Sequence, residues 1–230
     1  MSSSELVSVL IPTFNSEAYL AEAITSVLDQ DWQDLEIVVV DDGSTDSSFH
    51  IAQSFDRVTV LQGPHEGLAA TRNRGLAAAT GSFLLHLDAD DLLLPNAIAT
   101  LMQVFENHPS CTISAGRFSA FVSPEVPAHI ASRFDVHAQP QRGHLSGVAL
   151  IRSDVFNRIG PLDKKYEPAA DMEWWQRAVE ADVGIQFIDD LVQRRRIHGN
   201  NTSLLQRAAL RQASLLIARE ALRRRHSRNG

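Results

Sequence analysis

The sequence has 230 residues, and its 44% hydrophobic content is enough to fill the core of one domain. A single cysteine, Cys111, excludes an internal disulfide, and the N-terminus has neither the basic nor the apolar segment of a signal peptide. No apolar run comes near the roughly twenty residues that cross a bilayer, so we expect a cytoplasmic protein without a transmembrane segment.

Charge is distributed unevenly along the chain. The net charge is -7, yet the ten arginines from Arg194 onward face one acidic residue, Glu220, so that this tail carries +9 and residues 1–193 carry -16. An acidic body argues against nucleic acid as a partner. The basic tail indicates either a contact with an anionic partner or membrane surface, or a solvated helix face that balances the body.

The first half of the chain alternates between strands and helices. Two short β-branched runs, 6–11 and 35–40, predict buried strands, and the apolar residues between them recur at helical spacing. The alternation continues with a helix over 44–55, a strand over 58–61, an alanine-rich helix over 68–79 and a buried strand over 83–87. Strands separated by helices imply an α/β fold, a single domain with a mostly parallel central sheet flanked by helices.

The second half has a weaker pattern. We predict helices over 95–107, 154–159 and 171–181, and strands over 113–121, 146–151, 185–188 and 191–197. Residues 123–143 mix proline, histidine and polar residues without a period, and we expect a loop or flap there. From Leu204 onward, leucines and alanines alternate with arginines in a pattern that predicts a basic amphipathic helix.

Three aspartates directly follow the strand predicted at 83–87: Asp88, Asp90 and Asp91. In open α/β sheets, ligands bind at the carboxyl ends of the strands. Three carboxylates within four residues repel one another, and a hard divalent cation such as Mg²⁺ or Mn²⁺, which prefers oxygen ligands and often shares them with phosphates, would neutralise them. The alternative is a helix N-cap followed by solvent-exposed acids.

These aspartates belong to an ordered series of segments that resembles the family 2 inverting glycosyltransferases. The series comprises residues 7–15, 38–46, 67–75 and the acidic triplet, followed by 160–163, 171–177 and 196–203. The resemblance implies an A-type glycosyltransferase fold with a Rossmann-like nucleotide-binding half over 1–91 and an acceptor-binding half over 92–203. The basic helix over 204–230 lies outside it, as does the region 118–145.

For the donor, the resemblance implies a UDP-sugar whose base and ribose contact the loops after the first two strands. The positions are Pro12, Thr13, Phe14, Asn15, Glu17 and Asp42. A carboxylate such as Asp42 can accept from a uracil N–H, and Phe14 offers a flat apolar face. Helix capping is the alternative for Thr13 and Asn15. Arg72 resembles the family arginine that reaches the nucleotide, whereas helical geometry turns Arg74 elsewhere.

The resemblance also implies an Asp-x-Asp site that binds a Mn²⁺ or Mg²⁺ ion. Asp88 corresponds to the acid that touches ribose or metal, and Asp90 to the acid that coordinates the cation bridging the diphosphate. Ala89 lies beside the nucleotide, and Asp91 is expected to contact the donor sugar or to support the metal ligands from behind. His198 resembles a histidine that completes the metal shell in some members, with a purely structural role as the alternative.

For catalysis, the resemblance implies that Asp171 is the general base that takes the acceptor proton, with a helix N-cap as the alternative. Ala170 stands where the family usually has a first acid, which leaves Glu167 or Glu173 as substitutes, although helical geometry turns Glu173 away. Trp174 or Trp175 is predicted to face the acceptor. Only one of them can, because adjacent helical residues diverge by about 100 degrees.

We therefore predict a hexosyltransferase-type enzyme that moves a sugar from a UDP-sugar to an unknown acceptor hydroxyl. One alternative is a non-catalytic nucleotide-sugar-binding module, which Ala170 favours. Another is a sugar-phosphate nucleotidyltransferase, although the glycine-rich loop of that class is missing after the first strand. The basic helix predicts a homodimer contact, peripheral attachment at the inner face of the membrane, or docking of an acidic acceptor.

Overall fold

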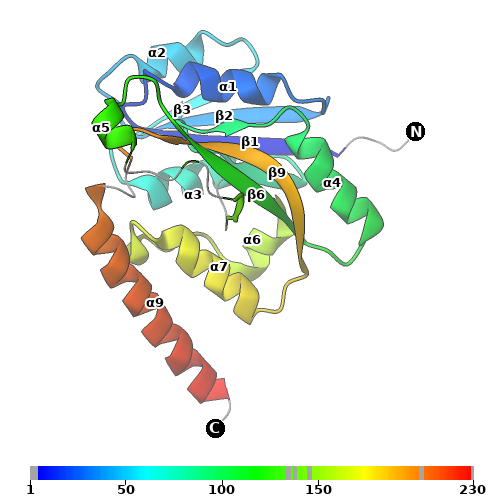
Figure 1. Ribbon diagram of the computed structural model, residues 1–230. Coiled ribbons are helices and arrows are strands. Elements are labelled where there is room, and N and C mark those ends of the chain that lie inside the picture. The colour runs from blue at the N-terminus through cyan, green and yellow to red at the C-terminus, as the bar shows by residue number, and fades with distance from the viewer. Residues whose placement is uncertain (1–4, 133–135, 137–138, 144–146, 202–204, 229–230) are drawn as a thin grey trace.

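The computed structural model describes residues 5–132, 136, 139–143, 147–201 and 205–228. A twisted central sheet has helices on both faces, and one long helix extends from the body at the C-terminal end (Figure 1). None of the described helices combines the length and the apolar character that a membrane span requires. The layers match the α/β architecture expected from the alternating elements.

The described part of the chain forms one nine-stranded sheet. The strands are β1 Val7–Thr13, β2 Leu35–Asp41, β3 Val58–Gln62, β4 Phe83–His86, β5 Leu92–Leu93, β6 Ile113–Val122, β7 Gln141–Arg142, β8 Ala149–Arg152 and β9 Ile185–Ile197. Their order is β3-β2-β1-β4-β8-β6-β9-β5, with β7 paired to β6. Strands β1 to β4 are parallel, as are β6 and β9, whereas β8 runs antiparallel to β4 and β6. The predicted mostly parallel α/β sheet is confirmed.

Helices pack on the two faces of this sheet. They are α1 Leu20–Leu28, α2 Ser48–Gln53, α3 Leu68–Ala78, α4 Ala97–Asn107, α5 Ala128–Ala131, α6 Asp154–Ile159, α7 Ala170–Glu180 and α9 Arg207–Arg228, with a 3-10 turn η1 at Lys164–Tyr166. Helices α1 and α4 share one apolar cluster with β1, through residues such as Val9 and Ile24. On the opposite face, α6, α7 and α9 share a second cluster around Trp174.

The strand order creates the crevice that positions the site. Strand β1 pairs with β2 on one side and with β4 on the other. The loops that follow β2 and β4 therefore lie on opposite sides of the carboxyl end of β1. Such a switch in strand order is where doubly wound sheets bind ligands. The segments after β1, β2 and β4 meet there.

The second half differs from the sequence prediction in two places. The two strands expected over 185–188 and 191–197 form one strand, β9, because Asp189 and Asp190 fill an exposed register shift against β6 and do not end the pairing. The loop expected over 123–143 contains α5 and β7, and part of it lies outside the described residues. Ser146, the predicted start of the β8 strand, also lies outside them.

Candidate active site

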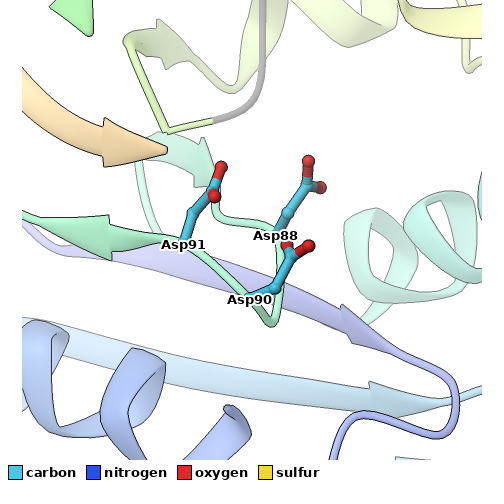
Figure 2. A group of neighbouring side chains, drawn as sticks. All are labelled: Asp88, Asp90 and Asp91. Carbon is cyan, nitrogen blue, oxygen red and sulfur yellow. The ribbon is translucent and has the colours of Figure 1, made fainter. Parts of the chain in front are cut away.

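The acidic triplet occupies the short loop between β4 and β5 (Figure 2). One carboxylate oxygen from each of Asp88, Asp90 and Asp91 lies within 4.8 Å of the others. Asp88 and Asp90 are half-buried and line a cavity of about 680 Å³ at the carboxyl ends of β1 and β4, and Ala89 lines it between them. Three negative groups this close repel one another, so the loop needs compensating partners.

Asp91 finds its partners inside the protein. Its carboxylate is 4% exposed and accepts hydrogen bonds from Gln193 Nε2 at 2.6 Å and from the Arg196 amide at 2.8 Å. Burial, together with the neighbouring charges of Asp90 and Asp88, raises the pKa of Asp91 well above its usual range. Both Asp91 oxygens accept from the chain, and Asp91 lines the cavity beside Asp88 and Asp90, which are less buried.

Asp90 and Asp88 are each held by one further element. Asp90 Oδ2 lies 2.8 Å from His198 Nε2 and accepts from Asn201 Nδ2 at 3.1 Å. Asp88 Oδ1 accepts from Arg72 Nη2 at 2.7 Å, in an ion pair between α3 and the acidic loop. The structure thus brings together four residues that the sequence pattern predicted near the cation: Asp88, Asp90, Asp91 and His198.

Arg196 is the residue that holds this loop in place, and the sequence did not single it out. Its side chain is buried, its Nε donates to the Asp90 carbonyl at 2.9 Å, and its Nη2 donates to Glu22 on α1 at 2.6 Å. The guanidinium also lies 4.8 Å from the ring centroid of Tyr19. Within the run from Arg194 to Arg196, no sequence signal shows which arginine is buried.

Arg72 connects the acidic loop to the small pocket that Asp171 also lines. The side chain is 3% exposed, and burial disfavours its charge, but the nearby carboxylates of Asp88, Asp171 and Glu167 prevail and raise the pKa of Arg72. Its Nε has no hydrogen-bond partner among the described residues. By contrast Arg74 pairs with Glu66 near the surface, as its helical phase predicted.

Asp171 lies in the first turn of α7, where it lines a small pocket with Arg72, Glu167 and Pro168. The N-cap of α7 is Ala169, two residues earlier, but the Asp171 carboxylate accepts from the Met172 amide at 2.9 Å, so the capping alternative applies to Asp171 in part. Glu167 accepts a hydrogen bond from the Leu68 amide at the start of α3. Glu173 is buried in an ion pair with Arg177 at 2.8 Å, which removes it as a substitute base.

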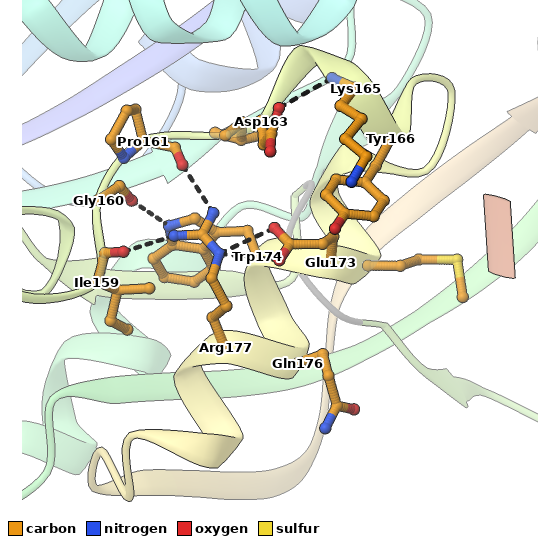
Figure 3. Close-up of polar contacts among 12 residues, drawn as sticks. Ile159, Gly160, Pro161, Asp163, Lys165, Tyr166, Glu173, Trp174, Gln176 and Arg177 are labelled. Carbon is orange, nitrogen blue, oxygen red and sulfur yellow. Dashed lines mark hydrogen bonds and ion pairs between the residues drawn. The ribbon is translucent and has the colours of Figure 1, made fainter. Parts of the chain in front are cut away.

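The helix that carries Asp171 is fixed by polar contacts to the segment before η1 (Figure 3). Arg177 donates from Nη2 to the Pro161 carbonyl at 2.7 Å, and Trp174 Nε1 donates to the Gly160 carbonyl at 2.9 Å. The carbonyls of Gly160 and Pro161 therefore each receive a donor from α7. The position of Asp171 follows from this clamp, one to two turns away along the same helix.

The two tryptophans of α7 correct a prediction. Trp174 is 0% exposed and stacks on Phe156, and Trp175 is 7% exposed and contacts Phe187, so neither ring faces the acceptor region. The helical phase argument expected one of them to point outward. It failed because α7 is covered on more than one side, by the sheet and by α9.

A second cavity, of about 360 Å³, adjoins the acidic one and is lined by Thr13, Phe14, Asp42 and His65. Phe14 is 42% exposed, and its ring stacks on His65 with 4.1 Å between centroids. Asp42 is buried and accepts from the Glu66 and Gly67 amides, both at 3.0 Å, and lies 2.8 Å from His65 Nδ1. His65 was not predicted, and nothing in its local sequence distinguishes it.

The loops after β1 and β2 bind each other. Asn15, at φ 50°, accepts from the Thr45 amide through its side chain at 2.8 Å, while Glu17 accepts from the Ser47 amide at 3.0 Å. The capping alternative therefore applies to Asn15 in part, since its side chain does cap a neighbouring loop. Pro12, Asn15 and Glu17 also line the acidic cavity, so the predicted donor positions meet at one edge of the sheet.

The residues of the acidic loop fit a hard divalent cation. Asp88 and Asp90 supply oxygen atoms toward the cavity, and the mutual repulsion of the three carboxylates is the kind of cost that a bound cation offsets. Asp88 and Asp90 would hold the cation, with His198 and Asn201 beside them. Bound there, the cation would neutralise charge on a diphosphate.

Comparisons with known proteins agree with this geometry. The model of the family "Glycosyl transferase family 2" matches residues 8–157. The chain therefore belongs to glycosyl transferase family 2. Glycosyltransferase GlyG of Streptococcus pneumoniae is 42% identical over 105 residues, which span 44% of this chain and 35% of GlyG. The chain thus matches about a third of the length of that curated relative.

Solved structures show the same fold. The structure of S. aureus TarS 1–349 has a TM-score of 0.71 at 23% identity and covers 94% of this chain and 65% of its own. A structure of TarS 1–349 in complex with UDP-GlcNAc has a TM-score of 0.68 at 22% identity and covers 85% and 60%. The A-type glycosyltransferase fold predicted from the sequence is confirmed.

Proposed function

We propose that the chain is an inverting glycosyltransferase that moves a hexose-type sugar from a UDP-sugar to an acceptor hydroxyl, with a divalent cation at Asp88 and Asp90 and with Asp171 as general base. The observation that carries the proposal is the buried Arg72, which pairs with Asp88 and feels the charge of Asp171. The Arg72 guanidinium would thus link Asp88, the acid beside the donor phosphates, to Asp171, the acid beside the acceptor.

The donor side follows from the two adjoining cavities. Uracil would occupy the cavity beside Asp42 and Phe14, and the diphosphate would lie over Asp88 and Asp90. A neighbour in fold space binds UDP-GlcNAc, which supports a UDP-sugar as the donor. Phe14 is covered by His65 in this structure, so a base that stacks on Phe14 has to displace the His65 ring or lie against its other face.

The reaction needs one proton acceptor and no covalent intermediate. The acceptor oxygen forms a bond to the anomeric carbon, its proton passes to the Asp171 carboxylate, and the bond from that carbon to the diphosphate oxygen breaks so that UDP leaves with the electron pair. A bound cation supplies charge stabilisation to that leaving group. Arg72, held next to Asp88, adds a fixed positive charge on the same side.

Two alternatives were open from the sequence. Family membership argues against a sugar-phosphate nucleotidyltransferase. A non-catalytic binding module remains the alternative that Ala170 favours, and Ala170 is buried in the apolar cluster, where an acid would need a partner. Apolar packing around position 170 is therefore a second explanation for the alanine found there.

The test is UDP release from a panel of nucleotide sugars with Mn²⁺, for the wild type and for Asp171→Asn. With water as the acceptor, the proposal predicts UDP release by the wild type and a loss of about 10²- to 10⁴-fold in the variant, because general-base catalysis contributes about that much. UDP affinity should be the same in both proteins. Tight UDP binding with no turnover by either protein would establish the binding module.

The outer face of α9 supports a further part of the proposal, a peripheral contact with anionic lipid. The helix packs on the body through Ala213, Ile217 and Ala221, and leaves Leu215 and Leu222 exposed on the other face. Arg211 and Arg219 flank them at helical spacing. An apolar stripe between arginines is suited to an anionic membrane surface. A homodimer contact and a cytoplasmic location stay predictions.

A further inference from the structure

The start of the C-terminal helix segment reaches the donor cleft. Leu205 and Gln206, just before α9, line the acidic cavity together with Asp88 and Asp90. This segment lies beyond the 8–157 stretch that the family model matches, and the sequence pattern assigned it only to the basic helix. A segment outside the stretch that the family model matches therefore contributes a wall of the candidate active site.

Gln206 lies where the two cavities adjoin. It lines the base-side cavity as well as the acidic one, and the other residues common to both are Pro12, Phe14 and Leu68. Those three side chains are apolar, so Gln206 supplies the polar side chain of the shared wall. Its amide makes no hydrogen bond to any residue that the structure describes.

The positions of the base, ribose and phosphates of a nucleoside diphosphate along the two cavities decide which of these groups contacts Gln206. With the base beside Asp42 and the diphosphate over Asp88 and Asp90, the ribose and the first phosphate span the junction of the cavities. A side-chain amide has two N–H donors and a carbonyl acceptor, so it can donate to a phosphate oxygen and bond a ribose hydroxyl.

The position of Gln206 is fixed by the docking of α9. Glu220 accepts from Lys165 Nζ at 2.9 Å and from the Tyr166 hydroxyl, and Arg224 pairs with Glu180 of α7 at 2.7 Å. The same α7 carries Asp171. The helix that directly follows Gln206 is therefore attached to the helix that carries Asp171, the proposed base.

We propose that Gln206 is a donor-binding residue that contacts the ribose and first phosphate of the nucleotide. This inference rests on the proposed function, because it places the nucleotide as that function does. It makes the C-terminal segment part of the donor site, where the sequence pattern had indicated only a surface helix.

The experiment is calorimetric titration of the full chain with UDP and with UMP in the presence of Mn²⁺. Gln206→Ala is compared with Gln212→Ala, a matched glutamine on the exposed side of α9 that lines neither cavity. Gln206→Ala should weaken both nucleotides by about tenfold, the usual effect of losing a hydrogen bond to a charged group, and Gln212→Ala should change neither.

The outcomes separate the two proposals. Unchanged affinity in Gln206→Ala beside a wild type that binds UDP overturns the Gln206 contact and leaves the proposed function standing. An equal loss of affinity in Gln212→Ala also overturns it, since that result would report on the docking of α9. A loss of affinity for UDP alone, with UMP unchanged, overturns it too, since the contact would then lie beyond the first phosphate. A wild type that binds neither nucleotide overturns both proposals.

Discussion

The loops after β1 and β2 hold each other through hydrogen bonds to the backbone, whereas the position of Asp171, the proposed base, depends on side chains of a single helix. On the donor side, Asn15 and Glu17 cap amides of the neighbouring loop, and Asp42 caps the turn before α3. Asp171, by contrast, is positioned by the clamp that Arg177 and Trp174 form with residues 159–161. Substitutions should therefore separate binding from transfer.

The difference also indicates which property, donor affinity or transfer, is more sensitive to substitutions. A site held by many backbone bonds keeps its shape when one side chain is altered, because the remaining bonds preserve the loop. A site held by one helix loses its geometry when that helix shifts. We expect donor affinity to be robust to acceptor-side substitutions, and transfer to be sensitive to them.

After Asp171→Asn, the largest effect should follow from changing Arg72, the residue that joins both sides. Arg72→Lys keeps the positive charge but loses the planar guanidinium that reaches Asp88. We expect kcat/KM to fall by about 100-fold, a loss of about 2.7 kcal/mol in transition-state stabilisation. Steady-state kinetics with varied donor measures it.

Arg74→Lys is the matched control for that change. Arg74 lies on the same helix and pairs with Glu66 at a more exposed position, where an ion pair contributes little. Its kcat/KM should stay within about twofold of the wild type. Equal losses in both variants would show that Arg72 has no special link between the two sides of the cleft.

A smaller effect should follow from Trp174→Phe, which tests the correction made for α7. The variant keeps an aromatic ring in the core but loses the donor to the Gly160 carbonyl. We expect a loss of about 1 kcal/mol in the free energy of unfolding, with Tm lower by about 2–4 °C. Thermal unfolding followed by circular dichroism measures it.

The acceptor KM should not change in Trp174→Phe, because the ring is buried against Phe156. A raised acceptor KM in a variant of unchanged stability would restore the stacking role that the sequence predicted. Such a result would also mean that α7 presents a different face in solution.

The smallest effect on turnover should come from the outer face of α9. Arg219→Gln removes one exposed arginine beside Leu215, and each such charge contributes about 1 kcal/mol to binding an anionic bilayer. We expect about fivefold weaker binding to phosphatidylserine vesicles at low salt and unchanged turnover of soluble substrates. Vesicle sedimentation measures it.

Arg57→Gln, an equal charge change on an exposed loop remote from α9, is the control and should leave vesicle binding unchanged. Wild-type protein that does not sediment with anionic vesicles at low salt would remove the membrane contact. The homodimer would then be the remaining prediction for this face.

The sequence predicted the first half of the fold well because its strands are continuous apolar runs with no competing pattern. Strand β9 was harder, since Asp189 and Asp190 resemble a turn although pairing continues past them with a register shift. Bulges depend on the partner strand, so local periodicity cannot detect them. The same limit applies to β5, a two-residue strand defined by its pairing with β9.

The candidate site likewise contains some residues that the sequence predicted and others that it did not. The places of Asp88, Asp90 and Asp171 at the two pockets were predictable because a resemblance fixed their order along the chain, while their roles stay predictions. Arg196 and Gln206 were not, because each belongs to a polar surface-like segment whose position depends on tertiary packing. Residues that act through long-range contacts have no local signature.

The most direct test of the account is calorimetric titration of UDP into the wild type and Asp90→Asn, each with Mn²⁺ and with EDTA. Because a cation held by Asp90 would neutralise charge on the diphosphate, the wild type should bind UDP at least about tenfold more tightly with Mn²⁺, and Asp90→Asn should lose that gain. Equal affinity of the wild type for UDP with Mn²⁺ and with EDTA would contradict the account.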